Sequence, residues 1–123
     1  MSEIYIHGVS NIISRAKIFL TELKEFAPFG IIYKNNEWID LVTYDEKLDS
    51  TTMRDFLINT IIKDFEERNT SFGAVCIDAK IKDVGDVIII YNTSNGKDWY
   101  ELVYKYSFDD GETVKILEEN IEY

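Results

Sequence analysis

Hydrophobic residues recur every three or four positions in two stretches of the chain, a spacing that predicts two amphipathic helices. The first covers residues 12–26, where Ser10 or Asn11 can cap the start and Pro28 stops the helix. The second is apolar along one side at Met53, Phe56, Leu57, Ile61 and Phe65. Asn69 can close its end, and three residues can cap its start: Asp49, Ser50 and Thr51.

Five further stretches alternate apolar and polar residues or form short apolar runs, which predicts five β-strands. They cover residues 30–33, 38–44, 72–81, 87–91 and 99–106. A tight turn with two asparagines joins the first pair into a hairpin, and Asn95-Gly96 joins the last pair. The run 87–91 is apolar on both faces, which predicts an interior strand. Residues 114–117 are compatible with a short edge strand or with a frayed tail.

The elements follow the order α-β-β-α-β-β-β, which predicts an α+β fold in one domain spanning residues 1–123. A single antiparallel sheet of about five strands, with both helices on one face, satisfies this order. The other face would then be bare, and aromatic side chains would line it toward solvent or toward a second copy of the chain. The candidates are Trp38, Tyr44, Trp99, Tyr100, Tyr104 and Tyr106.

The residues that usually carry chemistry are scarce. The chain has one cysteine, Cys76, and one histidine, His7, and neither has a partner at metal-ligand spacing. A single cysteine forms no intrachain disulfide, and its apolar surroundings favour a buried structural thiol. The sequence contains no glycine-rich phosphate loop and no nucleophile elbow. We therefore predict no catalytic residue, no metal and no cofactor, and favour a binding protein over an enzyme.

The start of the chain has no basic patch followed by an apolar run, and no window approaches the roughly 18 apolar residues of a membrane span. These features predict a soluble cytoplasmic protein without membrane contact. The formal net charge of −10 opposes binding to nucleic acid.

Most of the negative charge lies in two short segments. Residues 35–50 hold five acidic residues against one lysine, and residues 107–123 hold six against one. Three interpretations are open: a solvated surface that favours solubility, a docking surface for a basic partner, or metal capture. Docking on both segments at once requires that they be neighbours in space.

Aromatic residues make up 14% of the chain, including two tryptophans and eight tyrosines. Tyr and Trp are favoured at interfaces because each has an apolar body and a polar tip. The first acidic segment also contains Trp38 and Tyr44. This combination of acidic and aromatic residues predicts a surface for a basic protein. The candidate partner-binding residues are Trp38, Asp40, Tyr44, Asp45, Glu46 and Asp49, with the acidic C-terminal segment as a further candidate.

The junction Phe26-Ala27-Pro28-Phe29-Gly30, followed by a hairpin, a helix and the strand 73–78, resembles a group of small bacterial proteins with a similar element order. That resemblance implies no functional residues. In size and charge the chain is similar to immunity proteins, which neutralise partner toxins. Its element order is similar to roadblock and profilin-like folds, which often pair into scaffolds.

Three functions follow as hypotheses. The first is a non-enzymatic, acidic protein-binding domain of immunity type, in which carboxylates steer a basic partner and aromatics supply the desolvated contact. The second is a homodimeric scaffold of roadblock or profilin-like type, paired through the bare sheet face. The third is a small-ligand-binding domain with a pocket lined by aromatics between the helices and the sheet.

Overall fold

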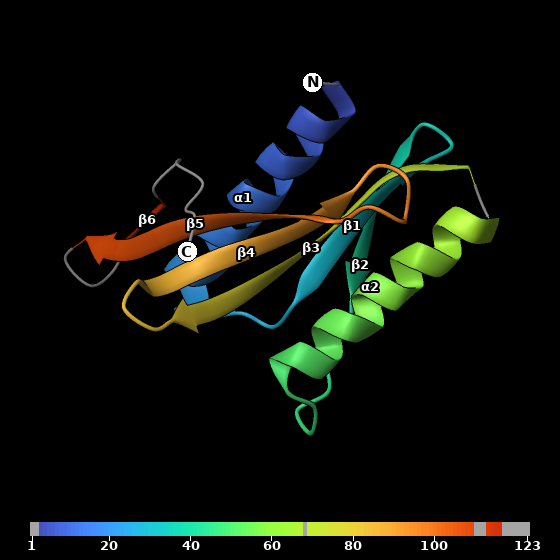
Figure 1. Cartoon of the computed structure of the whole chain (residues 1–123). Helices are drawn as coiled ribbons and strands as arrows, with labels where there is room; N and C mark the ends of the chain where they lie inside the picture. The colour runs from blue at the N-terminus through green and yellow to red at the C-terminus, as the bar shows by residue number, and fades with distance from the viewer. Residues whose placement is uncertain (1–2, 68, 110–112, 117–123) are drawn as a thin grey trace.

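Two helices and six strands follow one another in the computed structural model, which describes residues 3–67, 69–109 and 113–116 (Figure 1). Their bounds are α1 (Glu3–Leu23), β1 (Phe29–Lys34), β2 (Glu37–Val42), α2 (Ser50–Glu67), β3 (Thr70–Ile81), β4 (Gly85–Thr93), β5 (Tyr100–Asp109) and β6 (Thr113–Ile116). A search of the described helices finds none with the length and apolarity needed to cross a membrane.

The strands form one antiparallel sheet in the order β2-β1-β3-β4-β5-β6. The predicted α+β class and single antiparallel sheet are confirmed, but the described sheet has six strands where about five were expected. The addition is β6, which pairs with β5 and buries Val114 to 2% exposure. Residues 113–116 are therefore an edge strand, one of the two possibilities that the sequence left open.

The two helices lie on opposite faces of the sheet. Ile31 and Ile32 are neighbours on β1, so their side chains point to opposite faces. Ile31 packs in one cluster with Ile12 of α1, and Ile32 packs in another with Leu57 of α2. The expectation that both helices share one face is therefore wrong (Figure 1). The reason is that the central strands are apolar on both sides, so each face needs a cover.

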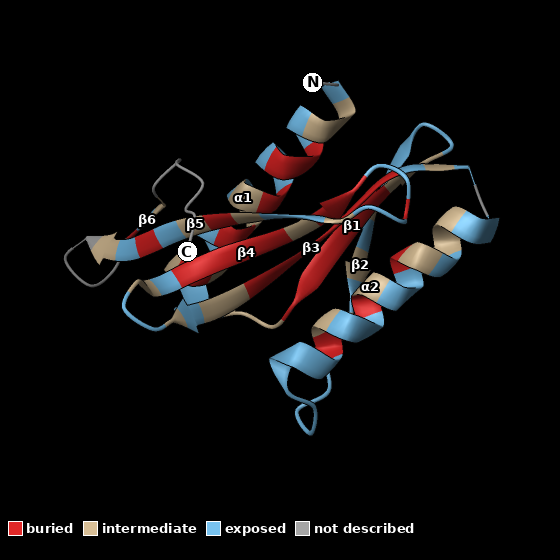
Figure 2. Cartoon of the chain, viewed as in Figure 1, coloured by how far each residue is buried: buried red, intermediate tan, exposed pale blue. Residues whose placement is uncertain are grey.

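The interior position predicted for β4 is confirmed. Its alternate residues Ile88 and Ile90 join the α1-side core, while Val87 and Ile89 join a cluster on the other face. All four are buried, and the central strands form a continuous buried layer (Figure 2). The predicted aromatic lining of a bare face is also wrong. The tyrosines of β5 lie on the α1 side, and Trp99 packs in the cluster beneath α2.

The first helix begins earlier and ends earlier than its periodicity predicts. It starts at Glu3 because Ile4, Tyr5 and Val9 extend the apolar stripe onto the sheet. It ends at Leu23, five residues before Pro28. Lys24, the next residue, adopts a positive φ of 67°, and its N–H donates to the Leu20 carbonyl at 2.9 Å. A left-handed residue after the last turn is a common helix terminator.

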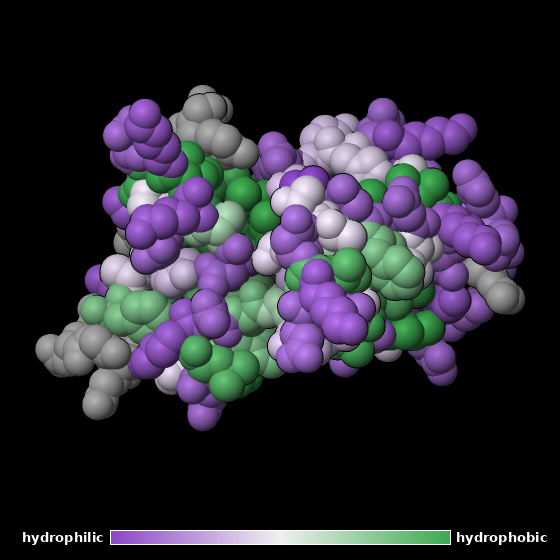
Figure 3. All heavy atoms as spheres, turned by 90° about the horizontal axis from the view of Figure 1, so that it is seen from below, coloured by the Kyte–Doolittle hydropathy of each residue, from purple (hydrophilic) through white to green (hydrophobic). Residues whose placement is uncertain are grey.

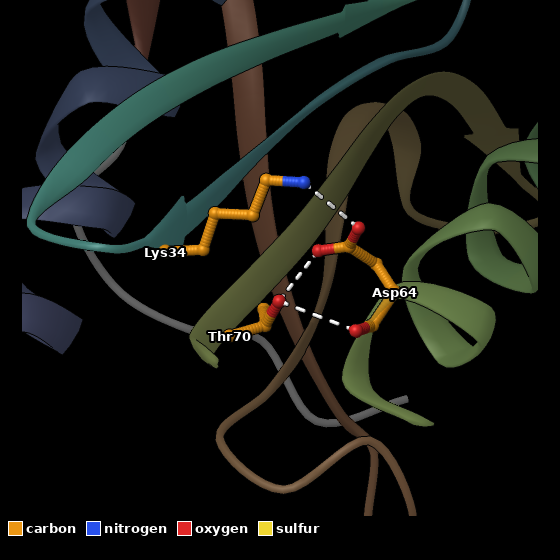
Figure 4. Close-up of polar contacts among 3 residues, drawn as sticks. All are labelled: Lys34, Asp64 and Thr70. Carbon is orange, nitrogen blue, oxygen red and sulfur yellow. Dashed lines mark hydrogen bonds and ion pairs between the residues drawn. The ribbon is translucent and has the colours of Figure 1, made fainter. Parts of the chain in front are cut away.

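The second helix is fixed at both ends by carboxylates. Asp49 is the N-cap, as one of the three predicted possibilities, because its Oδ1 accepts from the Thr52 N–H at 2.7 Å. Near the other end Asp64 accepts from Lys34 Nζ of β1 at 3.0 Å and from the Thr70 hydroxyl of β3 (Figure 4). These contacts tie the last turns of α2 to two strands.

Candidate functional site

β2 forms one edge of the sheet, and the turn before it sets the direction of its backbone groups. Asn35 and Asn36 both have positive φ, 50° and 63°, as expected for a two-residue hairpin turn. In such a hairpin the flanking residues, here Lys34 and Glu37, form a hydrogen-bonded pair. The Asn35 N–H donates to the Asn69 carbonyl at 3.4 Å, on the side away from β2. The positions at which β2 bonds to β1 can therefore be counted from the Lys34–Glu37 pair.

The same alternation leaves half of the β2 backbone open. Ile39 and Leu41 fall on the positions that bond to β1, because they are two and four residues beyond the closing pair. The N–H and C=O groups of Trp38, Asp40 and Val42 therefore point away from the sheet. Every second residue of β2 thus offers its backbone N–H and C=O along the outer side of the strand.

The side chains of these three residues share the α1 face of the sheet, because they pair with residues of the α1-side core on β1. The Trp38 ring lies 4.7 Å from the Tyr33 ring and 6.1 Å from the Phe72 ring, centroid to centroid, and the residue is 40% exposed. Val42 is 74% exposed, as is Tyr44 just beyond the strand. The edge therefore carries a supported aromatic platform and two accessible apolar side chains.

Asp40 is held by the neighbouring helix. Its Oδ1 accepts from Arg15 of α1 at 3.1 Å, and the Arg15 guanidinium lies 4.7 Å from the centre of the Phe29 ring. The Asp40 side chain is 68% exposed, so this ion pair adds little to stability. It does fix the position of the carboxylate while leaving most of its surface open to a second cation.

The acidic loop after β2 is ordered by its own carboxylates. Asp45 Oδ1 accepts from the Lys47 N–H at 2.9 Å, which closes an Asx turn. The backbone N–H and the hydroxyl of Thr52 hydrogen-bond to Asp49 and lower the pKa of that carboxyl. Both acids are exposed and have local structural roles in addition to their charge. Glu46 lies exposed between them.

The structure places Trp38 and Asp40 on β2 and the other four predicted binding residues in the loop that leads from β2 into α2. Of the second acidic segment it describes residues 107–109 and 113–116, which belong to β5 and β6. β2 and β6 are opposite edges of the sheet, which at ~4.8 Å per strand places them roughly 24 Å apart. The described part of the second segment is therefore not adjacent to β2. Five of the six acids of that segment lie outside the described residues, so joint action of the two segments stays a prediction; they are Asp110, Glu112, Glu118, Glu119 and Glu122.

Hydrophilic and hydrophobic residues are interspersed on the surface seen from below (Figure 3). In the described part of the chain, no group of three or more His, Cys, Asp or Glu residues is placed to hold a metal ion. Cys76 is buried, which raises the pKa of its thiol well above the usual value, in line with the predicted structural thiol.

The sequence pattern did not predict a second polar site, a hollow of about 330 Å³ beside the C-terminal end of α1. Its centre is a hydrogen bond of 2.6 Å from the Tyr106 hydroxyl to Asp78 Oδ1. Lys24, Lys80 and Asp86 also line it. The signal in the sequence was the single acid, Asp78, that follows directly on the apolar run 72–77.

Burial is the main cause that raises the pKa of Asp78, and the neighbouring charges of Asp86 and Glu25 add to the rise. The bonds from the Tyr106 hydroxyl and the Phe26 backbone act in the opposite direction. Burial, followed by the bond to Asp78, also raises the pKa of Tyr106. The pair therefore consists of a tyrosine that stays protonated and a carboxyl that holds its proton more tightly than usual.

Comparison of the chain with protein-family models, with curated proteins and with solved structures found no match. The β2 edge and the Asp78 hollow are therefore the two candidate sites of this chain.

Proposed function

We propose that the chain is a non-enzymatic protein-binding domain of immunity type, which binds a basic protein through β2 and the loop that follows it. The observation that carries this proposal is a continuous segment with exposed aromatic and acidic groups, on β2 and in the loop that leads from it into α2. Its residues are Trp38, Asp40, Tyr44, Asp45, Glu46 and Asp49.

The two kinds of side chain divide the work of binding. The carboxylates of residues 35–50 steer a basic partner over distances of about a Debye length, so they act mainly on the association rate. Trp38 and Tyr44 supply apolar area with a polar tip, the chemistry of interface hot spots. Because Trp38 is already packed against Tyr33, little conformational freedom is lost when its ring is covered.

The test begins with a partner purified from the native source by affinity capture, identified by mass spectrometry and produced separately. Its association rate is then measured between about 20 and about 500 mM NaCl, where screening is expected to slow binding at least tenfold. Glu46→Lys should slow association. The matched control Glu101→Lys makes the same charge change at an exposed position of β5, four strand spacings or roughly 19 Å from β2. Equal effects of the two variants, or a salt-independent rate, would remove the proposal.

A small-ligand-binding function is a second candidate, supported by the Asp78 hollow. The hollow is lined by side chains of both charges and by the hydroxyl-bearing ring of Tyr106; the charged residues are Lys24, Glu25, Asp78, Lys80 and Asp86. This lining suits a small zwitterion such as an amino acid. Titration of the labelled protein with the twenty amino acids, compared with Asp78→Asn, tests it. Amide shifts confined to other surfaces would eliminate this candidate.

The homodimeric scaffold loses the argument that motivated it. That hypothesis needed a bare apolar sheet face, whereas each face carries a helix. The apolar cluster that extends beyond α2 is itself buried, since Ile77, Val87, Ile89 and Val103 are at most 8% exposed.

A further inference from the structure

The outer side of β2 is a template for another strand. It is the first strand in the sheet order, and the backbone groups of Trp38, Asp40 and Val42 point away from β1. Natural proteins usually block such an edge with charged side chains, lysine above all, with proline or with a bulge, to prevent pairing with other chains. β2 has no proline and no lysine, and its pairing with β1 is continuous. Its two charged residues, Glu37 and Asp40, are acidic, so they oppose pairing with another acidic strand and not with a basic one.

We propose that the basic partner docks by adding an extended antiparallel segment to β2, which would become an additional strand of the sheet. This inference rests on the proposed function and specifies how the same surface is used. Main-chain hydrogen bonds to the three open residues would supply affinity, and side-chain contacts on the two faces would supply specificity.

The α1 face defines the sequence that the added segment needs. Its residues paired with Trp38, Asp40 and Val42 would share the face of those side chains. They would meet an aromatic ring, a carboxylate and a valine in that order. A segment with a basic residue between two apolar residues, spaced two apart, complements this row. The Asp40 side chain, 68% exposed beside Arg15, has room for the second cation.

A second copy of the chain is a poor occupant of the same edge. Its β2 lies in the segment 35–50, which holds five acidic residues against one lysine, so two copies would bring like charges together. The charge of the edge therefore selects a basic segment over self-pairing.

The probe is the synthetic peptide Thr-Val-Thr-Arg-Thr-Val-Thr, capped at both ends, with binding followed by amide shifts of the labelled protein. Strand addition predicts an alternation along the peptide. N-methylation at the arginine removes an N–H directed at β2 and should weaken binding at least tenfold, on the order of 1.4 kcal/mol. N-methylation at the threonine after it removes an N–H directed away from β2 and should weaken binding less than threefold.

The protein carries the reciprocal test. Val42→Pro removes one outward N–H without touching a bond to β1, and proline is tolerated at such edge positions. Val42→Ala is the matched control for the loss of the exposed side chain. We expect Val42→Pro to bind the peptide at least fivefold more weakly than Val42→Ala, with the amide spectra of both variants otherwise native.

Three results would overturn the inference. They are equal effects of the two N-methyl groups, absence of peptide binding, or a concentration-dependent dimer in sedimentation that Val42→Pro abolishes. The first two leave the proposed function standing if the purified partner still binds with the expected salt dependence and Glu46→Lys effect. Loss of that salt dependence, with the peptide alternation intact, would instead refute the electrostatic function and leave strand addition.

Discussion

The hydroxyl of Tyr106 on β5 donates a 2.6 Å hydrogen bond to Asp78 on β3, reaching across β4. Burial raises the pKa of this carboxyl, and the bond from Tyr106 favours its ionised form. The folded chain therefore keeps a half-buried acid whose preferred protonation state depends on one neighbouring hydroxyl.

Tyr106→Phe should lower the free energy of unfolding by about 1–2 kcal/mol at pH 7, because an ionised Asp78 loses a donor. A raised folded pKa means that the contribution of Asp78 to stability falls as the pH rises through that pKa. Tyr106→Phe raises the folded pKa of Asp78 further. The loss of unfolding free energy in this variant should therefore shrink as the pH falls toward about 4. Urea unfolding at several pH values measures this. In the background of Asp78→Asn the pH dependence of the deficit should disappear; its persistence there would assign it to another group.

Asp49→Ala should lower the thermal unfolding midpoint, because the first turn of α2 loses the acceptor for the Thr52 N–H. The lowered pKa of Asp49 means that its contribution is present above the unfolded pKa and is lost as the pH falls through the folded one. The deficit should therefore be largest at pH 7 and become smaller in acid, where the protonated Asp49 remains a neutral cap. Asp49→Asn, a neutral cap, should retain most of the stability at neutral pH. A deficit that is constant with pH would contradict this account.

Lys34 and Asp64 should be energetically coupled, because their 3.0 Å contact is largely shielded from solvent, with side chains 21% and 15% exposed. A double-mutant cycle with Lys34→Met and Asp64→Asn should give a coupling energy of about 1 kcal/mol. The exposed pair of Arg15 and Asp40 is the comparison, with an expected coupling below about 0.5 kcal/mol. Equal coupling in the two cycles would mean that burial does not distinguish them.

Gly8→Ala should destabilise the fold although alanine is the better helix former. A Cβ at this position would lie 2.5 Å from Cε2 of the fully buried Phe72 ring. The overpacking cost of 1–3 kcal/mol should exceed the helix-propensity gain of about 1 kcal/mol, for a net loss of about 1 kcal/mol. Ser14→Ala, at an exposed position of the same helix, should be neutral or slightly stabilising. A stabilised Gly8→Ala variant would show that the ring has room to move.

The local elements could be predicted from the sequence because their signals are local. The two asparagines fixed the first hairpin through their tolerance of positive φ, and Asp49 was among the predicted caps. The side on which each helix packs could also have been inferred. Neighbours such as Ile31-Ile32 and Val75-Cys76 bury both faces of a strand, which requires a cover on each.

The spatial arrangement of the site depended on strand order, which pairwise residue patterns do not encode. The six candidate residues lie within twelve positions of one another in the sequence, and the structure places them on β2 and in the loop that follows it. The described residues of the second acidic segment are on β5 and β6 because β3 to β6 form a meander that leads away from β2. In the sequence Asp78 is only a single polar residue after an apolar run. Its hydrogen-bond partner Tyr106 lies 28 positions away in the chain, so the sequence pattern does not reveal the pair.

The pairing of β1 with β3 has a consequence for folding kinetics. Every other pair of neighbouring strands in the described sheet is also consecutive along the chain, whereas β1 and β3 are separated by β2 and all of α2. Closing that long loop costs entropy before its contacts repay it, so we expect it to limit the folding rate. The β2 edge joins the sheet only through β1, and it therefore reaches its final setting in the last pairing step. A partner that recognises this edge would select chains that have completed folding.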